Sequence, residues 1–257
     1  MYILNIETST KNCSVSLSNN GNTIASKELS EAGFSHAELL HVFIKDVLEQ
    51  AKLGFEDLSA IAVSQGPGSY TGLRIGVSAA KGLCFALNIP LISVDTLQVL
   101  AMQANIQNGF IVPMIDARRM EVYSAIFDKN FNKTREIQAQ ILDENSFSEI
   151  NETIYFLGDC NQKAKTVLNK SNFVFMENDT YPSSKEISQI SFKKFQENKF
   201  EDVAYFEPYY LKDFLTTVAS SSKWRDKKNY NSDRNFTILT LSDCLSKSIL
   251  FSFAKFR

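Results

Sequence analysis

The sequence predicts an α/β protein with two lobes, each built on a mixed sheet that is flanked by helices. Three observations lead to this class. Residues 2–7, 13–18 and 23–29 have the composition of three successive strands, helical and strand-like segments alternate after them, and a similar pair of strands begins again at Ile111. Successive strands followed by alternating helices and strands are typical of a sheet with helices packed on its faces.

The chain is long enough for both lobes. It has 257 residues, of which 44% are hydrophobic, and lobes of roughly 100 residues can each bury a core. We expect a first lobe in residues 1–104, a second lobe in residues 105–214 and a basic, poorly ordered extension in residues 215–257. The extension has eight Lys and Arg against three Asp and Glu, so it carries +5 and the rest of the chain −7.

Charge and composition limit the classes of function. An acidic body binds RNA poorly by itself, because Lys and Arg neutralise the phosphates, so we expect a partner protein to hold any RNA. No apolar run approaches the roughly 20 residues of a membrane span and no signal-like segment precedes the first strand, which favours a cytoplasmic protein. The cysteines are too far apart for a zinc site or a disulfide framework; they are Cys13, Cys84, Cys160 and Cys244.

The elements of the first lobe follow in a regular order. Asn20 and Gly21 separate the second and third strands and favour a tight hairpin. The elements expected after them are a helix over about 35–52, a strand that ends at Ser64, a helix over about 72–87 and a strand over 91–94.

The most informative stretch of the chain joins the strand that ends at Ser64 to the next helix. It reads GPGSYTGLRIG over residues 66–76, with four glycines and one proline. A glycine-rich turn at this place points backbone N–H groups and a helix N-terminus outward, which suits an anion or a closely packed neighbour. Its spacing matches neither the Walker loop nor the dinucleotide-binding fingerprint.

The second lobe is predicted to repeat the first. Residues 111–116 form an apolar strand that ends in Asp116, as residues 2–7 end in Glu7, and a strand over 122–127 and a turn over 128–130 follow. Two such openings, each with a carboxylate at the end of its first strand, are typical of the duplicated actin-like (ASKHA, RNase H-like) fold; two unrelated hairpins are the alternative. The further elements expected here are a strand over 153–158 and helices over about 161–170 and 183–196.

The two helices of the first lobe are more apolar than one sheet-facing side requires. Because a large exposed apolar patch usually marks a binding surface, we expect a helix–helix interface with a second subunit. Burial of both helices inside the chain's own two lobes is the alternative. The residues predicted at this interface are His36, Leu40, Phe43, Ile44, Leu73, Arg74, Gly76, Val77, Ala80 and Leu83.

The chain lacks the side-chain patterns of a self-sufficient active site. His36 and His41 are five residues apart, which places them about 140° apart around a helix, whereas zinc ligands on one helix need about 40°. We therefore expect no catalytic residue and no metal ligand. Glu7 and Asp116 have the positions of acids that hold Mg and ATP in this fold, and the residues predicted near a nucleotide are Glu7, Thr8, Ser9 and Asp116.

Four stretches of the chain match one family. They read ILNIETST over residues 3–10, SHAELL over 35–40, GPGSYTGLRIG over 66–76 and DARRMEVY over 116–123. With these motifs the chain resembles the bacterial TsaB proteins, also called YeaZ, over about residues 1–214. Glu7 replaces the aspartate that is common in the family, and the segment after Leu215 has no counterpart in it.

The resemblance implies a non-catalytic subunit with an actin-like fold. It implies pairing with TsaD, the transferase that places the threonylcarbamoyl group on the adenosine next to the anticodon of tRNAs that read ANN codons. A TsaE-like ATPase would join this pair, and tRNA would be reached only through the complex. We expect no tightly bound cofactor. Two possibilities are left open: ATP or ADP with Mg at the partner interface, and a homodimer of the isolated chain. The alternatives are a degenerate ATP-dependent phosphotransferase and a metallopeptidase.

Overall fold

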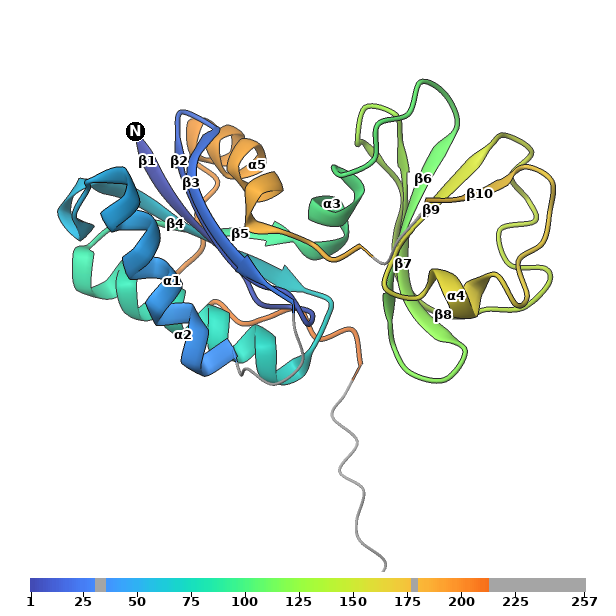
Figure 1. The fold of residues 1–257 in the computed structure, drawn as a ribbon, viewed down its shortest axis with the longest axis horizontal. Helices are drawn as coiled ribbons and strands as arrows, with labels where there is room; N and C mark the ends of the chain where they lie inside the picture. Colours follow the sequence, from blue (N-terminus) through green and yellow to red (C-terminus); the bar gives the residue numbers. More distant parts are fainter. Residues whose placement is uncertain (31–35, 177–179, 213–257) are drawn as a thin grey trace, which may run out of the picture. The chain divides into compact units, whose positions relative to one another are not determined.

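The computed structural model of the chain describes residues 1–30, 36–176 and 180–212 (Figure 1). Residues 1–213 form one compact unit. The predicted extension, residues 215–257, lies outside the described residues. The described part of the chain contains two five-stranded sheets.

The two sheets have the same topology. The first has the order β3-β2-β1-β4-β5 and the second the order β10-β9-β6-β7-β8. In each sheet the central strand pairs antiparallel with the strand that follows it and parallel with the strand on its other side. The strands are β1 (Tyr2–Glu7), β2 (Cys13–Asn19), β3 (Asn22–Leu29), β4 (Leu58–Gly66), β5 (Leu91–Asp95), β6 (Phe110–Asp116), β7 (Glu121–Asp128), β8 (Lys133–Ile141), β9 (Ile154–Gly158) and β10 (Phe173–Phe175).

This duplication makes the fold actin-like, as predicted. β6 has the place in the second sheet that β1 has in the first, so the repeated opening at Ile111 reflects a repeated sheet. β1 is a central strand with both faces covered. Leu4 and Ile6 belong to the core beneath one pair of helices, whereas Ile3 belongs to the core on the opposite face.

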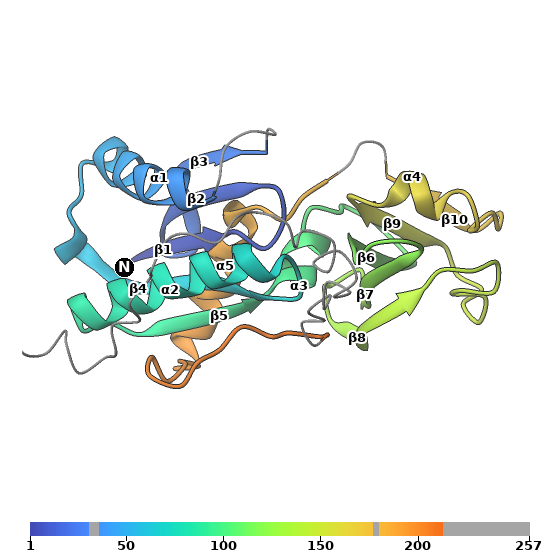
Figure 2. The ribbon, with the colours of Figure 1, turned by 90° about the horizontal axis from the view of Figure 1, so that it is seen from below.

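Helices cover both faces of the first sheet (Figures 1 and 2). One face packs against α1 (His36–Ala51) and α2 (Tyr70–Leu87), and the other against α5 (Ser184–Gln196) and α3 (Thr96–Ala101). α4 (Asn161–Ala164) contacts β9 of the second sheet, and a short 3-10 helix covers Phe55–Asp57. None of the helices in the described ranges is both long and apolar enough to cross a membrane.

Four elements were not expected from the sequence, namely β8, β10, α3 and the 3-10 helix over Phe55–Asp57. β10 has only three residues and gives no strand pattern, whereas β8 is an edge strand whose residues 136–141 do alternate between polar and apolar side chains. α4 is shorter than the helix expected over 161–170. The division of the lobes at residue 104 stays a prediction, but α5, which lies in the range expected for the second lobe, packs on the first sheet.

Candidate functional site

The glycine-rich turn runs from β4 into α2, as the sequence predicts. Ser69 is the N-cap of α2, and its side chain accepts a hydrogen bond from the N–H of Gly72. A β-carbon at Gly68 would collide with the carbonyl group of Ser9, and one at Gly72 with that of Thr8. The Ser69 N–H also donates to the Ser9 carbonyl oxygen at 2.6 Å. The glycines therefore allow close packing of the turn on the segment after β1.

The same turn contacts a segment near the end of the described chain, residues 201–212, which we call the C-terminal strap. Gly66 has a φ of 118°, a conformation that favours glycine, and a β-carbon there would lie 2.6 Å from the carbonyl oxygen of Tyr209. The Tyr209 N–H donates to the carbonyl oxygen of Gln65 at 2.7 Å. The turn is thus enclosed by the chain itself on two sides.

Three of the four residues predicted near a nucleotide lie in this enclosed region. Glu7 is fully buried, and its two oxygens accept hydrogen bonds from the Ser9 N–H, at 2.6 Å, and from the Ser64 hydroxyl. Burial raises the pKa of Glu7 above its ordinary value of 4.5. Thr8 and Ser9 are buried as well, and the Thr8 hydroxyl donates to the carbonyl oxygen of Gly72 at 2.8 Å. In this arrangement Glu7 offers no exposed oxygen to a metal ion.

The fourth residue, Asp116, is exposed at the end of β6. Its carboxylate forms an ion pair with Lys163 of α4 and accepts a hydrogen bond from the Arg118 N–H at 2.9 Å. The Asp116 N–H donates to Asp159, whose carboxyl pKa is raised, mainly by burial. Because Asp116 is paired with a lysine and Glu7 is enclosed, the two acids as placed do not fit a shared Mg–nucleotide site.

The two histidines lie on different sides of α1. His36 is half-buried, with its Nε2 2.8 Å from the carbonyl oxygen of Thr10, and His41 is exposed. Among the described residues, no group of three or more His, Cys, Asp or Glu side chains is placed to hold a metal ion.

Most residues predicted at the subunit interface belong to the chain's own interior. Those with at most 4% exposure are Leu40, Ile44, Leu73, Val77 and Ala80. Gly76 is buried against Thr8, where a β-carbon would collide with the threonine side chain. These six residues face the sheet or the segment after β1, so they offer no surface to a partner. Phe43 and Leu83 are half-buried, and Arg74 is exposed.

A different side of α2 faces outward. Apart from Arg74, which stacks on Tyr70, its exposed residues share one face: successive members are three, four or seven positions apart, and the last lies four positions after Gly82. Gly82 has no atom of another residue near the place of a β-carbon, and Phe85 is 85% exposed. On the neighbouring helix α1, Val42 is 53% exposed. We call this face the outer stripe of α2; it consists of Thr71, Ser78, Gly82, Phe85 and Ala86.

The sequence interpretation missed this stripe because α2 is apolar on nearly all sides. Apolar character therefore could not distinguish its buried face from its exposed one. The strap also contacts α2, which no sequence pattern shows. Lys81 of α2 donates to the carbonyl oxygens of Ala204, at 3.2 Å, and Phe206, at 2.9 Å. Arg74 stacks on Tyr70, 4.1 Å from the ring centroid, and its Nε donates to the Tyr210 hydroxyl at 3.1 Å.

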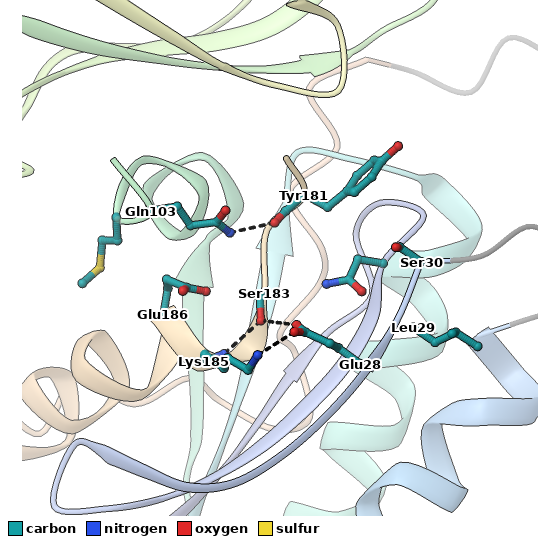
Figure 3. A pocket seen from close by; sticks show the side chains of 10 residues that line it. Glu28, Leu29, Ser30, Gln103, Tyr181, Ser183, Lys185 and Glu186 are labelled. Atoms are coloured by element: carbon teal, nitrogen blue, oxygen red, sulfur yellow. Dashed lines mark hydrogen bonds and ion pairs between the residues drawn. The ribbon is translucent and has the colours of Figure 1, made fainter. Parts of the chain in front are cut away.

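A polar pocket of about 660 Å³ lies where the end of β3 meets the start of α5 (Figure 3). Glu28 accepts hydrogen bonds from Ser183 at 2.7 Å and from Lys185 at 2.5 Å. Although burial opposes the shift, these bonds hold the pKa of Glu28 below its ordinary value. Gln103 lies across the pocket and donates to the carbonyl oxygen of Tyr181 at 2.7 Å. These contacts tie α5 to β3, so we assign this group a structural role.

Two comparisons of the sequence with known proteins match most of the chain. A family model described as TsaD, tRNA N6-adenosine threonylcarbamoyltransferase, matches residues 29–239. The tRNA threonylcarbamoyladenosine biosynthesis protein TsaB of Escherichia coli (strain K12) is 30% identical over 221 residues, which cover 82% of this chain and 95% of that protein.

One further similarity in sequence covers only part of the chain, and another similarity concerns the fold. The tRNA N6-adenosine threonylcarbamoyltransferase of Dictyoglomus turgidum (strain DSM 6724 / Z-1310) is 42% identical over 113 residues, 38% of this chain and 34% of that protein. The solved structure of YeaZ from Pseudomonas aeruginosa superposes with a TM-score of 0.71 at 24% identity and covers 82% of this chain and 99% of that one. This structural likeness supports the actin-like fold.

Proposed function

Since this chain belongs to the TsaB (YeaZ) family of tRNA threonylcarbamoyladenosine biosynthesis proteins, we propose that it is a non-catalytic subunit that pairs with and activates a TsaD-like transferase. A TsaE-like ATPase joins the pair. The chain and the transferases are similar in sequence, as the partial match to the Dictyoglomus enzyme indicates. Two proteins of one fold can then pair through equivalent helices.

The observation that supports this proposal is the outer stripe of α2. Four of its five residues are small, and Gly82 faces open space, so a helix of another protein can approach the α2 backbone closely. Phe85 stands exposed beside these small residues and supplies the large apolar contact that an interface centre needs. Val42 is a further exposed apolar side chain, on the neighbouring helix α1. Exposed apolar side chains on two adjacent helices favour a protein partner.

We expect Phe85→Asp and Gly82→Arg to weaken the pairing by about tenfold or more, because each places a charge or a long side chain in the contact. The pairing is measured by co-purification with the transferase of the same organism and by titration of the two purified proteins. Threonylcarbamoyladenosine in cellular tRNA, measured by mass spectrometry of nucleosides, should fall in parallel. Val77, which the sequence analysis placed at the interface, is buried, so a charge there would unfold the chain instead.

Ile141→Asp is the matched control, because Ile141 is 71% exposed but lies at the end of β8 in the other sheet. It should leave both pairing and tRNA modification unchanged. Circular dichroism of all three variants shows whether the fold is kept. Undiminished pairing by the well-folded Phe85→Asp and Gly82→Arg variants would remove the outer stripe from the proposal.

The non-catalytic role has a separate test. The purified chain should hydrolyse no ATP above the level of Asp116→Ala, because Asp116 is paired with Lys163 and Glu7 is enclosed. ATP turnover that is lost in Asp116→Ala would instead support a phosphotransferase.

A further inference from the structure

The turn between β6 and β7, residues 116–121, has features that the outer stripe of α2 does not explain. Arg118 and Arg119 have φ values of 71° and 50°, in the left-handed region that residues with a β-carbon seldom adopt. Both side chains are exposed. Within the described ranges, neither guanidinium group has a hydrogen-bond or ion-pair partner. Two adjacent arginines are therefore held in an uncommon backbone conformation with their charged groups in solvent.

A lysine from another element holds this turn in place. The Nζ of Lys163, on α4, donates to the carbonyl oxygens of Arg119, at 2.9 Å, and Glu121, at 2.7 Å, and it also pairs with the Asp116 carboxylate. These three acceptors match the three N–H groups of an ammonium ion. The side chain of Lys163 is 21% exposed, so water screens these bonds only in part. The conformation of the arginine pair is thus set before any ligand arrives.

The charge of the arginine pair is not balanced within the turn. Its two carboxylates already have lysine partners, since Asp116 pairs with Lys163 and Glu121 with Lys212 of the strap. Arg118 and Arg119 therefore add positive charge at one place on a body that carries −7 overall. The half-buried ring of Tyr123 is close to this place, with its centroid 5.9 Å from the Nζ of Lys212.

We propose that the turn of Arg118 and Arg119 contacts the phosphate backbone of RNA directly. Guanidinium groups bind phosphates in pairs of hydrogen bonds, and an aromatic ring beside cations offers a surface on which a base can stack. An acidic protein would use the charge but not the ring, so RNA is the better match. This inference rests on the proposed function, which makes tRNA the substrate of the assembly. It differs from the sequence-based expectation that RNA is reached only through a partner.

The test uses the full chain and a short fluorescein-labelled RNA hairpin, with fluorescence anisotropy as the readout. The wild-type chain should bind the hairpin at about 50 mM salt and lose affinity as salt is raised, as counterion release requires. Arg118→Glu and Arg119→Glu should each weaken binding by about fivefold or more and lower the slope of log affinity against log salt by about 1. Lys129→Glu, at the exposed turn that follows β7, is the matched control and should change neither quantity.

Three results would overturn the inference. These are no binding of the hairpin by the wild-type chain, equal losses in Lys129→Glu and the arginine variants, and binding of a labelled polyglutamate peptide as tight as that of RNA. Arg118→Lys keeps the charge and should keep most of the affinity, which separates loss of charge from misfolding. The measurement needs no transferase, and Arg118→Glu should still pair with it. A failure of RNA binding is therefore distinguishable from a failure of the pairing.

Discussion

At the scale of single residues, Glu7 shows how burial changes the role of a side chain. Its position at the end of β1 predicts a carboxylate that faces a ligand, but the structure encloses it between Ser9 and Ser64. An ionised carboxylate is costly to bury without a cation, and no lysine or arginine of the described chain forms an ion pair with it. We expect Glu7 to hold the end of β1 against β4 through Ser64 and against the segment after β1 through Ser9.

This leads to a prediction on pH dependence. The pKa of Glu7 is raised above 4.5, so the folded state holds the proton more tightly than the unfolded state does. The free energy of unfolding should therefore fall as the pH rises from the pKa of Glu7 in the unfolded state through its pKa in the folded state. Glu7→Gln keeps the shape without the charge and should raise the Tm at pH ~8 by about 2–4 °C, equivalent to about 1 kcal/mol.

The advantage of Glu7→Gln should shrink as the pH is lowered toward the ordinary pKa of 4.5, because the wild-type side chain is then increasingly protonated in the unfolded state as well. Thermal unfolding followed by circular dichroism across this pH range measures the effect. Glu144→Gln, at an exposed position, should give no such trend. A Glu7→Gln variant less stable than wild type at pH ~8 would show that the carboxylate is stabilised as an anion.

At the scale of elements, α5 is a helix with a polar buried face. Ser184, Ser188 and Ser191 are almost fully buried against the first sheet. Asn5 of β1 is central to the contact, since its Nδ2 donates to the Ser188 hydroxyl at 3.2 Å and its Oδ1 accepts from the Ser191 hydroxyl at 2.8 Å. Hydrogen bonds between buried groups, rather than apolar area alone, therefore hold this helix in place.

Ser191→Ala should lower the free energy of unfolding by about 1–3 kcal/mol, because it leaves the buried Oδ1 of Asn5 without its donor. Gln189→Ala on the exposed face of the same helix should change it by less than about 0.5 kcal/mol. Urea unfolding of both variants measures the difference. Equal effects of the two substitutions would mean that the serine contact adds little to stability.

At the scale of the whole molecule, the first sheet is completed by residues that come after the second sheet. The chain returns through α5, and Ile187 joins the core on the face of the first sheet away from α1 and α2. The strap then adds Val203 and Phe206 to the core on the other face. The first lobe is therefore discontinuous in sequence.

A fragment of residues 1–104 should show no cooperative unfolding, because one face of its sheet lacks α5. Fusion of residues 181–212 to this fragment through a glycine-rich linker should restore a cooperative transition in circular dichroism. The same fusion with Ile187→Asp should fail, since Ile187 is fully buried. Cooperative unfolding of the fragment 1–104 alone would contradict a discontinuous lobe.

Many elements could be predicted from the sequence because their signals are local. The apolar run of β1, the Asn20–Gly21 hairpin and the glycine-rich turn before α2 each depend on neighbouring residues, and the structure confirms all three. α3 was missed because a six-residue helix has weak periodicity, and β8 was not predicted although its residues 136–141 alternate between polar and apolar side chains.

The candidate site was harder to predict because its residues meet only in the folded chain. Sequence analysis selected apolar residues of α1 and α2 as a partner surface, but Leu40, Val77 and Ala80 fill the chain's own core. An almost entirely apolar helix does not reveal which side it buries. The exposed side follows from the position of α1 and of the strap beside α2.

The sequence by itself determined the duplicated actin-like class and the family, because both depend on short motifs and on the order of elements. Only the tertiary structure decided which carboxylates are enclosed, which face of α2 is exposed and which charges stay unpaired at the turn of Arg118 and Arg119. The physical reason is that burial and pairing depend on contacts between segments far apart in the chain. α4, which carries Lys163, and the strap are such segments. No local sequence pattern shows that α4 contacts the turn of Arg118 and Arg119 or that the strap contacts α2.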